Sequence, residues 1–113
     1  MNIKRGHVYT ANLNPRFGTE AGKIRPVLAV QTDLINADHP STLVCLLTSK
    51  IDPRVEVLRV HLRKGEAGLD RSSDVMIDQI RAIDNRRLRK EVGKLSSLHM
   101  AEVEERLKIV LDL

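Results

Sequence analysis

The runs Arg25-Pro26-Val27-Leu28-Ala29-Val30 and Thr42-Leu43-Val44-Cys45-Leu46-Leu47-Thr48-Ser49 decide the fold. Their apolar stretches are short, continuous and bounded by polar segments, a pattern that is typical of strands buried on both faces. The proline that follows Arg25 also biases this arginine towards an extended backbone. The sequence therefore predicts two central strands, one over 27–30 and one over 42–49.

Shorter and more polar segments surround these two runs. Residues 7–14 are rich in strand formers and end at Pro15, so we expect a strand there and a loop over 15–24. A second polar loop is expected over 33–41. The first half of the chain is therefore expected to consist of strands that are separated by polar loops.

The second half continues with further strand signals. Valine and leucine alternate with polar residues over 55–62, which predicts a half-exposed strand with one irregularity. A turn region containing Gly65 and Gly68 follows, and we expect another strand over 74–83. Polar residues interrupt this last strand near its end.

An amphipathic helix is expected at the end of the chain, capped by Ser96 or Ser97. Its apolar positions follow three- and four-residue spacing, and charged residues occupy the other face. They are Met100, Val103, Leu107, Val110 and Leu111. We therefore expect one domain over 1–113 of mostly β (α+β) class, a small curled antiparallel sheet or barrel with this helix packed on it.

The composition restricts the classes of function that the chain can have. The chain has 113 residues, and 19 Lys and Arg against 15 Asp and Glu give a net charge of +4, which favours an anionic partner. Basic residues concentrate in 1–30 and 81–90, and if these two segments lie together they form one positive face for a phosphate backbone. The alternative is a solvated surface whose charge the acidic final helix balances. Trp is absent and Tyr9 and Phe17 are the only aromatic residues, which excludes a base-stacking platform of several rings.

Cysteine and motif content point to a cytoplasmic protein without cofactor or metal. The single cysteine, Cys45, lies in an apolar run and is expected to be a buried structural thiol. No signal peptide or apolar run of about 20 residues is present, so a reducing cytoplasm is expected. Phosphate-binding loop, dinucleotide and zinc-protease motifs are absent, and the four histidines are scattered without ligand spacing.

Three polar segments stand out as candidates for chemistry. The loop that ends at Arg25 would let its guanidinium clamp a phosphate, with a salt bridge to Glu20 or Asp78 as the alternative. The strand end Thr48-Ser49-Lys50 carries two hydroxyls and a cation that suit a phosphate oxygen. Asp78 and Gln79 are adjacent in a strand, so one of them must point inward or into a cleft.

The order and spacing of these motifs resemble one known family. Lys4-Arg5-Gly6-x-Val8-Tyr9, Leu13-Asn14-Pro15, Gly18-x-Glu20-x-Gly22-Lys23-x-Arg25-Pro26-Val27-Leu28, Leu47-Thr48-Ser49 and Asp78-Gln79-Ile80-Arg81-x-Ile83-Asp84 follow one another without a large gap. The chain thus resembles the MazF/PemK (Kid-like) toxins of type II toxin–antitoxin systems.

The resemblance implies a fold and an activity. These toxins are SH3-like small β-barrels with a terminal helix that form homodimers. They cut single-stranded RNA, chiefly mRNA, at short sequences without a metal. The 2′-hydroxyl attacks the adjacent phosphate and leaves 2′,3′-cyclic phosphate and 5′-hydroxyl ends. A cognate antitoxin blocks the RNA channel with an acidic C-terminal segment. No cofactor and no membrane are expected.

The resemblance also assigns site residues. Arg25 resembles the catalytic arginine, where charge stabilisation is the expected role, and Thr48 resembles its partner hydroxyl. Phe17 lies in the segment that resembles the one covering RNA. The expected RNA-binding set is Phe17, Thr19, Glu20, Lys23, Asn36, Ser49, Lys50, Asp78 and Gln79.

The chain departs from the family pattern at three positions, and two alternative functions remain. His7 replaces the usual acidic residue, and Met76 and Thr19 replace an Arg and a His of the Kid branch, which favours the Arg25/Thr48 mechanism. A gyrase poison of the related CcdB family would rely on a Trp near the C-terminus, which this chain lacks. A non-catalytic nucleic-acid-binding module is the other alternative, against which the retained Arg25 and Thr48 argue.

Overall fold

The computed structural model describes residues 1–15, 18–19 and 23–113. Within these residues six strands form one antiparallel sheet in the order β4-β5-β3-β2-β1-β6. The strands are β1 (His7–Asn12), β2 (Ile24–Ala29), β3 (Ser41–Thr48), β4 (Arg59–Leu62), β5 (Ser73–Asp84) and β6 (Leu88–Lys94). The helical elements are α1 (Asp33–Asn36), α2 (Ser97–Leu111) and the 3₁₀ turns η1 (Pro53–Leu58), η2 (Glu66–Gly68) and η3 (Asn85–Arg87). The expected mostly β class with a terminal helix is confirmed.

The two central strands are buried on both faces, as their apolar runs predict. Along β3, Cys45 and Leu47 face the apolar cluster under α2, whereas Val44 and Leu46 face a second cluster on the other side of the sheet. The alternation follows from the two-residue period of a strand. Cys45 is fully buried, which confirms the expected buried thiol, and this burial raises its pKa to about 12.

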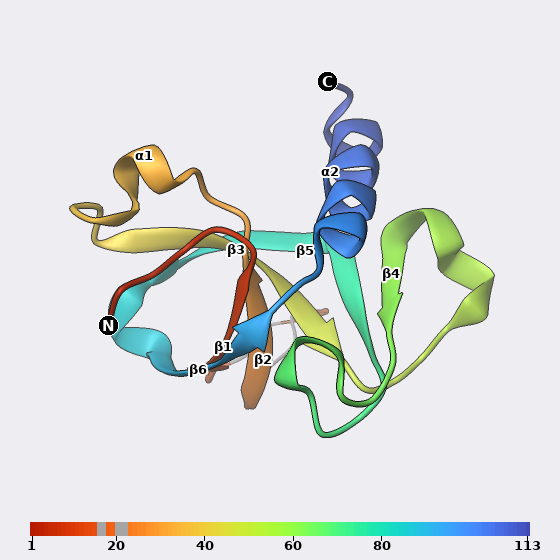
Figure 1. Ribbon diagram of the computed structural model, residues 1–113, viewed down its shortest axis with the longest axis horizontal. Helices are drawn as coiled ribbons and strands as arrows, with labels where there is room; N and C mark the ends of the chain where they lie inside the picture. Colours follow the sequence, from red (N-terminus) through yellow and green to blue (C-terminus); the bar gives the residue numbers. More distant parts are fainter. Residues whose placement is uncertain (16–17, 20–22) are drawn as a thin grey trace.

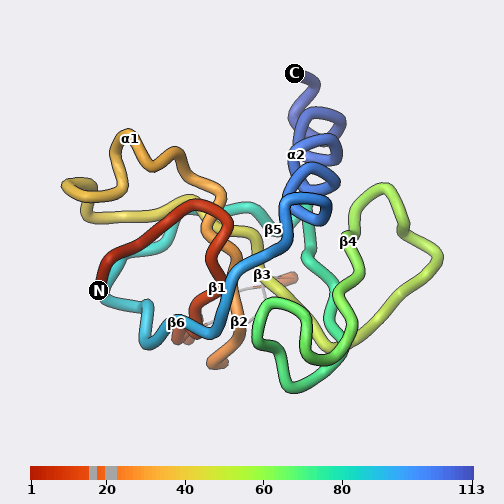
Figure 2. The backbone as a smooth tube through the Cα atoms, viewed as in Figure 1, coloured from red at the N-terminus to blue at the C-terminus, as the bar shows by residue number. Residues whose placement is uncertain are grey.

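The sheet curls strongly, but in the described part of the chain it does not close into a barrel. Strands β4 and β6 are its two edges. Figure 1 shows the curl, and the backbone trace in Figure 2 shows the segment that contains η2 folded back beside β6. The 3₁₀ turn η2 thus lies against an edge strand and covers part of the opening that full strand pairing would close.

Two glycines allow this close approach of η2 to β6. A Cβ on Gly93 would lie 2.4 Å from the Ala67 carbonyl oxygen, and a Cβ on Gly68 would lie 2.1 Å from the Val92 carbonyl oxygen. Gly68 also has a φ of +74°, which favours glycine. In both cases the added Cβ would clash with a main-chain carbonyl group. Such a clash is difficult to relieve, because a main-chain atom cannot rotate away as a side chain can.

We expect Gly93→Ala to lower the free energy of unfolding by about 1–3 kcal/mol, because the methyl group overpacks this contact. Urea denaturation followed by circular dichroism measures the change. Lys94→Ala, at the neighbouring exposed position of β6, is the matched control and is expected to change stability by less than about 0.5 kcal/mol. Equal stabilities of the two variants would contradict the close packing of η2 on β6.

The terminal helix begins as the sequence predicts. The Ser96 side chain accepts a hydrogen bond from the His99 N–H and caps α2. Val103 is buried, and Met100, Leu107 and Val110 pack against the core cluster beside it. Leu111, expected on the same face, is instead exposed in the last turn. Among helices of the described residues, none combines the length and apolar character needed to cross a membrane.

Three local predictions differ from the structure. The strand expected over 55–62 begins only at Arg59, because Pro53 and the cap formed by Asp52 start the turn η1 instead. The loop expected over 33–41 contains the short helix α1, which Thr32 caps. Strand β6 was not expected from the sequence: it is an edge strand that fully buries only its first residue, so its apolar pattern is weak.

Candidate functional site

A pocket opens where β2 and β3 separate. The two strands pair from Val27 opposite Leu46 inward. Beyond that point, Leu47 and Thr48 continue to pair with β5, after an irregularity in the ladder that follows Cys45. The resulting cavity has a volume of about 720 Å³. Its lining residues are Thr10, Lys23, Ile24, Arg25, Pro26, Leu47, Thr48, Ser49, Gly68, Leu69, Asp70, Arg71, Ser73, Lys90, Glu91 and Val92.

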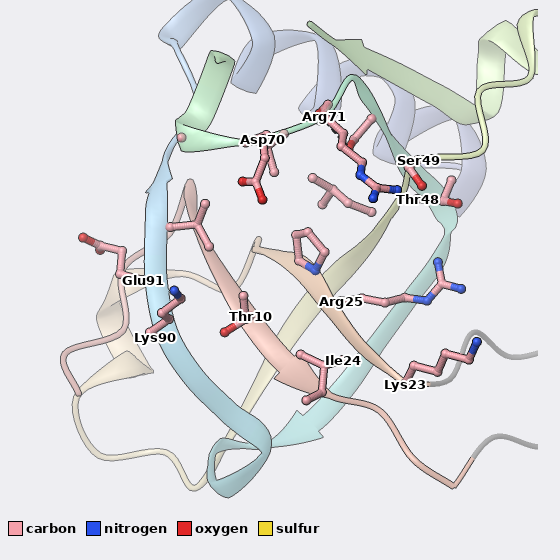
Figure 3. Close-up of a pocket in the computed structure, with 16 residues that line it drawn as sticks. Thr10, Lys23, Ile24, Arg25, Thr48, Ser49, Asp70, Arg71, Lys90 and Glu91 are labelled. Carbon is pink, nitrogen blue, oxygen red and sulfur yellow. Dashed lines mark hydrogen bonds between the residues drawn. The ribbon is translucent and has the colours of Figure 1, made fainter. Parts of the chain in front are cut away.

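Arg25 and Thr48 both line this pocket. The ladder between β2 and β3 ends at Val27 and Leu46, and each of the two residues lies two positions beyond that last pair. Figure 3 shows the two side chains at the same side of the pocket, with Lys23 beside them. The structure therefore brings together the two residues expected to be catalytic.

Local sequence explains how Arg25 is held. It pairs with Ala11 of β1, so its backbone is fixed in the sheet while its side chain stays half-buried. Pro26 has no N–H to donate. Because β2 pairs with β3 only from Val27 onward, no hydrogen bond to β3 is lost at Pro26. A rigid extended backbone thus carries the guanidinium to the edge of the pocket.

Thr48 is held at the end of β3 and is 7% exposed. Its hydroxyl oxygen accepts a hydrogen bond from the Lys50 N–H at 3.1 Å. A hydroxyl also has one donor hydrogen, which suits an anionic oxygen. Ser49 is exposed beside it at the pocket wall. Two neighbouring hydroxyls therefore end the strand at the cavity.

A buried carboxylate organises the segment after Thr48. Asp74 lies opposite Thr48 in the β3–β5 ladder, and its side chain is 3% exposed. It accepts hydrogen bonds from Arg59 Nη1 at 3.1 Å and from the Asp52 N–H at 3.3 Å. The His61 ring Nδ1 lies 3.0 Å from its other oxygen. Arg59 Nη1 also donates to the Lys50 carbonyl oxygen. Asp74 thus ties residues 50–52 to the sheet behind the two hydroxyls.

The loop before β2 supplies one more predicted residue to the pocket. Lys23 adopts a φ of +67° and donates its backbone N–H to the Asn14 side chain at 2.8 Å, which fixes the end of the loop. Thr19 is exposed in a turn and does not line the cavity. Phe17 and Glu20, also expected to bind RNA, lie outside the described residues.

Besides Thr19, four more predicted RNA-binding residues lie outside this pocket. Asn36 is buried in α1, where its side chain bonds Gln31 and Asp33, so its amide groups serve the helix. Lys50 is exposed just beyond the cavity. Asp78 and Gln79 lie on β5, exposed and half-buried respectively. The lining includes none of the four.

Four charged lining residues were not among the residues predicted from the sequence. Asp70 and Arg71 follow η2, while Lys90 and Glu91 lie on β6. The described lining thus has four cationic side chains, Lys23, Arg25, Arg71 and Lys90, against the two acidic ones, Asp70 and Glu91. The sequence contains little that indicates these four residues, because η2 and β6 come to lie beside β2 only through the curl of the sheet.

The two basic stretches are therefore brought together in part. Pairing of β1 with both β2 and β6 places Lys90 beside the start of β2 through Thr10. Two other cations of that stretch have structural partners: Arg86 pairs with Asp84, and Arg87 donates to the carbonyl oxygens of Asn12 and Asn14. The hydrogen bonds and charge of Arg86 lower the pKa of the Asp84 carboxyl to about 2.

The donor set of the pocket does not resemble a metal centre. In the ranges 1–15, 18–19 and 23–113, no group of three or more His, Cys, Asp or Glu side chains lies close enough to hold a metal ion. Cationic side chains and hydroxyls dominate the side of the pocket that carries Arg25. Such groups bind anions, and phosphate oxygens fit them well.

Comparison with known proteins identifies relatives of the whole chain. Residues 4–111 match the family model described as PemK-like, MazF-like toxin of type II toxin-antitoxin system. The Bacillus subtilis (strain 168) protein named Endoribonuclease EndoA is 37% identical over 113 residues, which cover 100% of this chain and 97% of that protein.

Solved structures agree with the sequence matches. MazF from Deinococcus radiodurans is 27% identical and superposes with a TM-score of 0.83, covering 100% of this chain and 99% of that one. A MazE-MazF structure from the same organism is 25% identical with a TM-score of 0.80 and covers 100% and 99%. The chain belongs to the PemK-like, MazF-like family of toxins of type II toxin-antitoxin systems.

Proposed function

We propose that this protein is an endoribonuclease toxin that cuts single-stranded RNA, chiefly mRNA, at the edge of the pocket where Arg25 and Thr48 meet. The observation that carries the proposal is their placement: half-buried Arg25 and buried Thr48 line the same pocket, which opens where β2 and β3 separate. The relative named an endoribonuclease and the family match support the reaction class.

The proposed reaction is an internal displacement at phosphorus. The ribose 2′-oxygen forms a bond to the adjacent phosphorus as its proton passes to solvent, and the bond from phosphorus to the 5′-oxygen breaks. The leaving 5′-oxygen gains a proton. The products are a 2′,3′-cyclic phosphate and a 5′-hydroxyl end, so no water is consumed and no metal-bound nucleophile is required.

Arg25 and Thr48 have separate roles in this step. Negative charge builds on the phosphoryl oxygens as the fifth bond forms, and the Arg25 guanidinium stabilises it more strongly than it stabilises the ground state. An arginine remains protonated at neutral pH, so charge stabilisation rather than proton transfer is its role. The Thr48 hydroxyl donates to a non-bridging oxygen, while Ser49 and Lys23 hold neighbouring parts of the backbone.

The remaining binding roles extend beyond the pocket. Asp78 and Gln79 on β5 contact RNA outside the cavity, and a homodimer of this chain completes the groove. A cognate antitoxin, like the MazE partner named in the Deinococcus radiodurans structure, inhibits the protein through an acidic C-terminal segment that pairs with the pocket cations. The protein acts in the cytoplasm, where mRNA is available.

Chelation tests the reaction class. We expect the purified protein to cut a long single-stranded RNA at an unchanged rate in excess EDTA, because cationic side chains rather than a metal stabilise the transition state. Gel analysis gives the rate, and mapping of the ends is expected to show 5′-hydroxyl groups. The Arg25→Ala protein is the blank that reveals contaminating ribonuclease. Loss of cutting in EDTA that Mg²⁺ restores would contradict the proposal.

A further inference from the structure

The pocket has a region that phosphate chemistry does not account for. Its lining includes three apolar residues that keep exposed surface, Ile24, Pro26 and Val92. Figure 3 shows Arg25 and Lys23 on one side of the pocket, whereas Asp70 and Lys90 lie away from them. Apolar surface does not bind a phosphate, whereas the flat face of a nucleobase packs against it.

Carboxylates at the far side of the pocket also argue against a second phosphate there. Like charges repel, so the RNA backbone is expected to follow the side with Arg25 and Thr48 and to keep away from Asp70. A carboxylate accepts hydrogen bonds only, and it can therefore read the donor groups of a base edge. Base edges are available in single-stranded RNA because its bases are unpaired.

Of the two carboxylates, Asp70 is the one available to a ligand. Glu91 lies 2.7 Å from the ring Nδ1 of His7, so an oxygen of its carboxylate already has a partner. Asp70 is exposed, directly follows buried Leu69 and points into the pocket in Figure 3. Lys90 lies on the same side and offers donors to a carbonyl or ring nitrogen of the same base.

We propose that this pocket binds the base of a nucleotide flanking the cut, and that Asp70 selects adenine, cytosine or guanine over uracil. The first three bases present an exocyclic amino group that donates to a carboxylate. Uracil presents a single N–H between two carbonyl oxygens, which repel it. This inference rests on the proposed RNA-cutting function and assigns Asp70 a specificity role that is separate from the catalytic roles of Arg25 and Thr48.

A randomised RNA pool tests the inference. The full chain digests the pool in EDTA, and sequencing of the new ends gives the base frequencies on each side of the cut. Uracil is expected to be depleted about tenfold at one flanking position, as the loss of one hydrogen bond to a charged group predicts. Asp70→Asn, whose amide both donates and accepts, is expected to reduce that depletion to less than about twofold.

Controls separate the possible failures. Asp38→Asn, an exposed carboxylate outside the pocket, is expected to keep the wild-type base profile. Absence of uracil depletion in the wild type, or a depletion that Asp70→Asn leaves unchanged, would overturn the role of Asp70 while the nuclease function stands. Complete absence of cutting by folded wild-type protein would reject the function itself, and the inference with it. Thermal melting confirms that both variants are folded.

Discussion

Arg25→Ala is expected to lower the rate of RNA cleavage by a factor of about 100 or more while the protein stays folded. Arg25 is half-buried and lines the pocket together with Thr48. Removing one group that stabilises developing negative charge costs enzymes about 10²–10³ in rate. Single-turnover cleavage of a fixed RNA, with enzyme in excess, measures the chemical step directly.

An arginine outside the pocket supplies the control for this prediction. Arg54 is exposed and pairs with Asp52, and it does not line the cavity. Arg54→Ala removes the same charge from the protein but is expected to change the rate by less than about threefold. Equal losses in the two variants would show that Arg25 acts through net charge alone, and full activity of folded Arg25→Ala would remove it from the catalytic site.

Asp74→Ala is expected to lower the free energy of unfolding by about 3 kcal/mol. The substitution leaves the mostly buried Arg59 guanidinium and the Asp52 N–H without their acceptor. Breaking a buried ion pair by removing one partner costs about 3–5 kcal/mol, and the lower end applies because Arg59 is still 20% exposed. Urea denaturation measures the change.

A double-mutant cycle tests whether Asp74 acts through Arg59. The double variant Asp74→Ala, Arg59→Ala is expected to lose less stability than the sum of the two single variants, because neither charge is then left unpaired. Asp38→Ala, which removes an exposed carboxylate, is expected to change stability by less than about 0.5 kcal/mol. A loss below about 1 kcal/mol for Asp74→Ala would contradict the structural role of the cluster.

Apolar periodicity correctly predicted the elements that contribute most to the hydrophobic core. The central strands β2 and β3 and the helix α2 bury continuous or regularly spaced apolar residues, so the chain itself carries the signal. The prediction was wrong over 55–58, where alternating valines lie in the turn η1. There the backbone preference of Pro53 and the Asp52 cap outweigh the two-residue alternation of apolar side chains, and residues 55–58 pair with no strand.

The candidate site was predictable only in part. Arg25 and Thr48 stood out through their motifs, but their placement in one pocket depends on where β2 and β3 separate, which no local pattern fixes. Asp70 was missed because it reaches the pocket through the segment after η2, and Lys90, expected only as part of the basic stretch 81–90, reaches it through the edge strand β6. Asn36 lies in a segment with a loop-like sequence, yet it is buried in α1 and its side chain bonds Gln31 and Asp33, contacts that the sequence does not indicate.

A single 2′-deoxy substitution tests the central claim, cleavage by the RNA's own hydroxyl beside Arg25 and Thr48. The substrate is a short RNA with one efficient cut site, compared with the same strand carrying deoxyribose at the nucleotide on the 5′ side of the cut. In excess EDTA we expect the all-ribose strand to give 2′,3′-cyclic phosphate and 5′-hydroxyl ends and the substituted strand to remain uncut. Cutting of the substituted strand at the same bond would contradict the account, because it requires an external nucleophile.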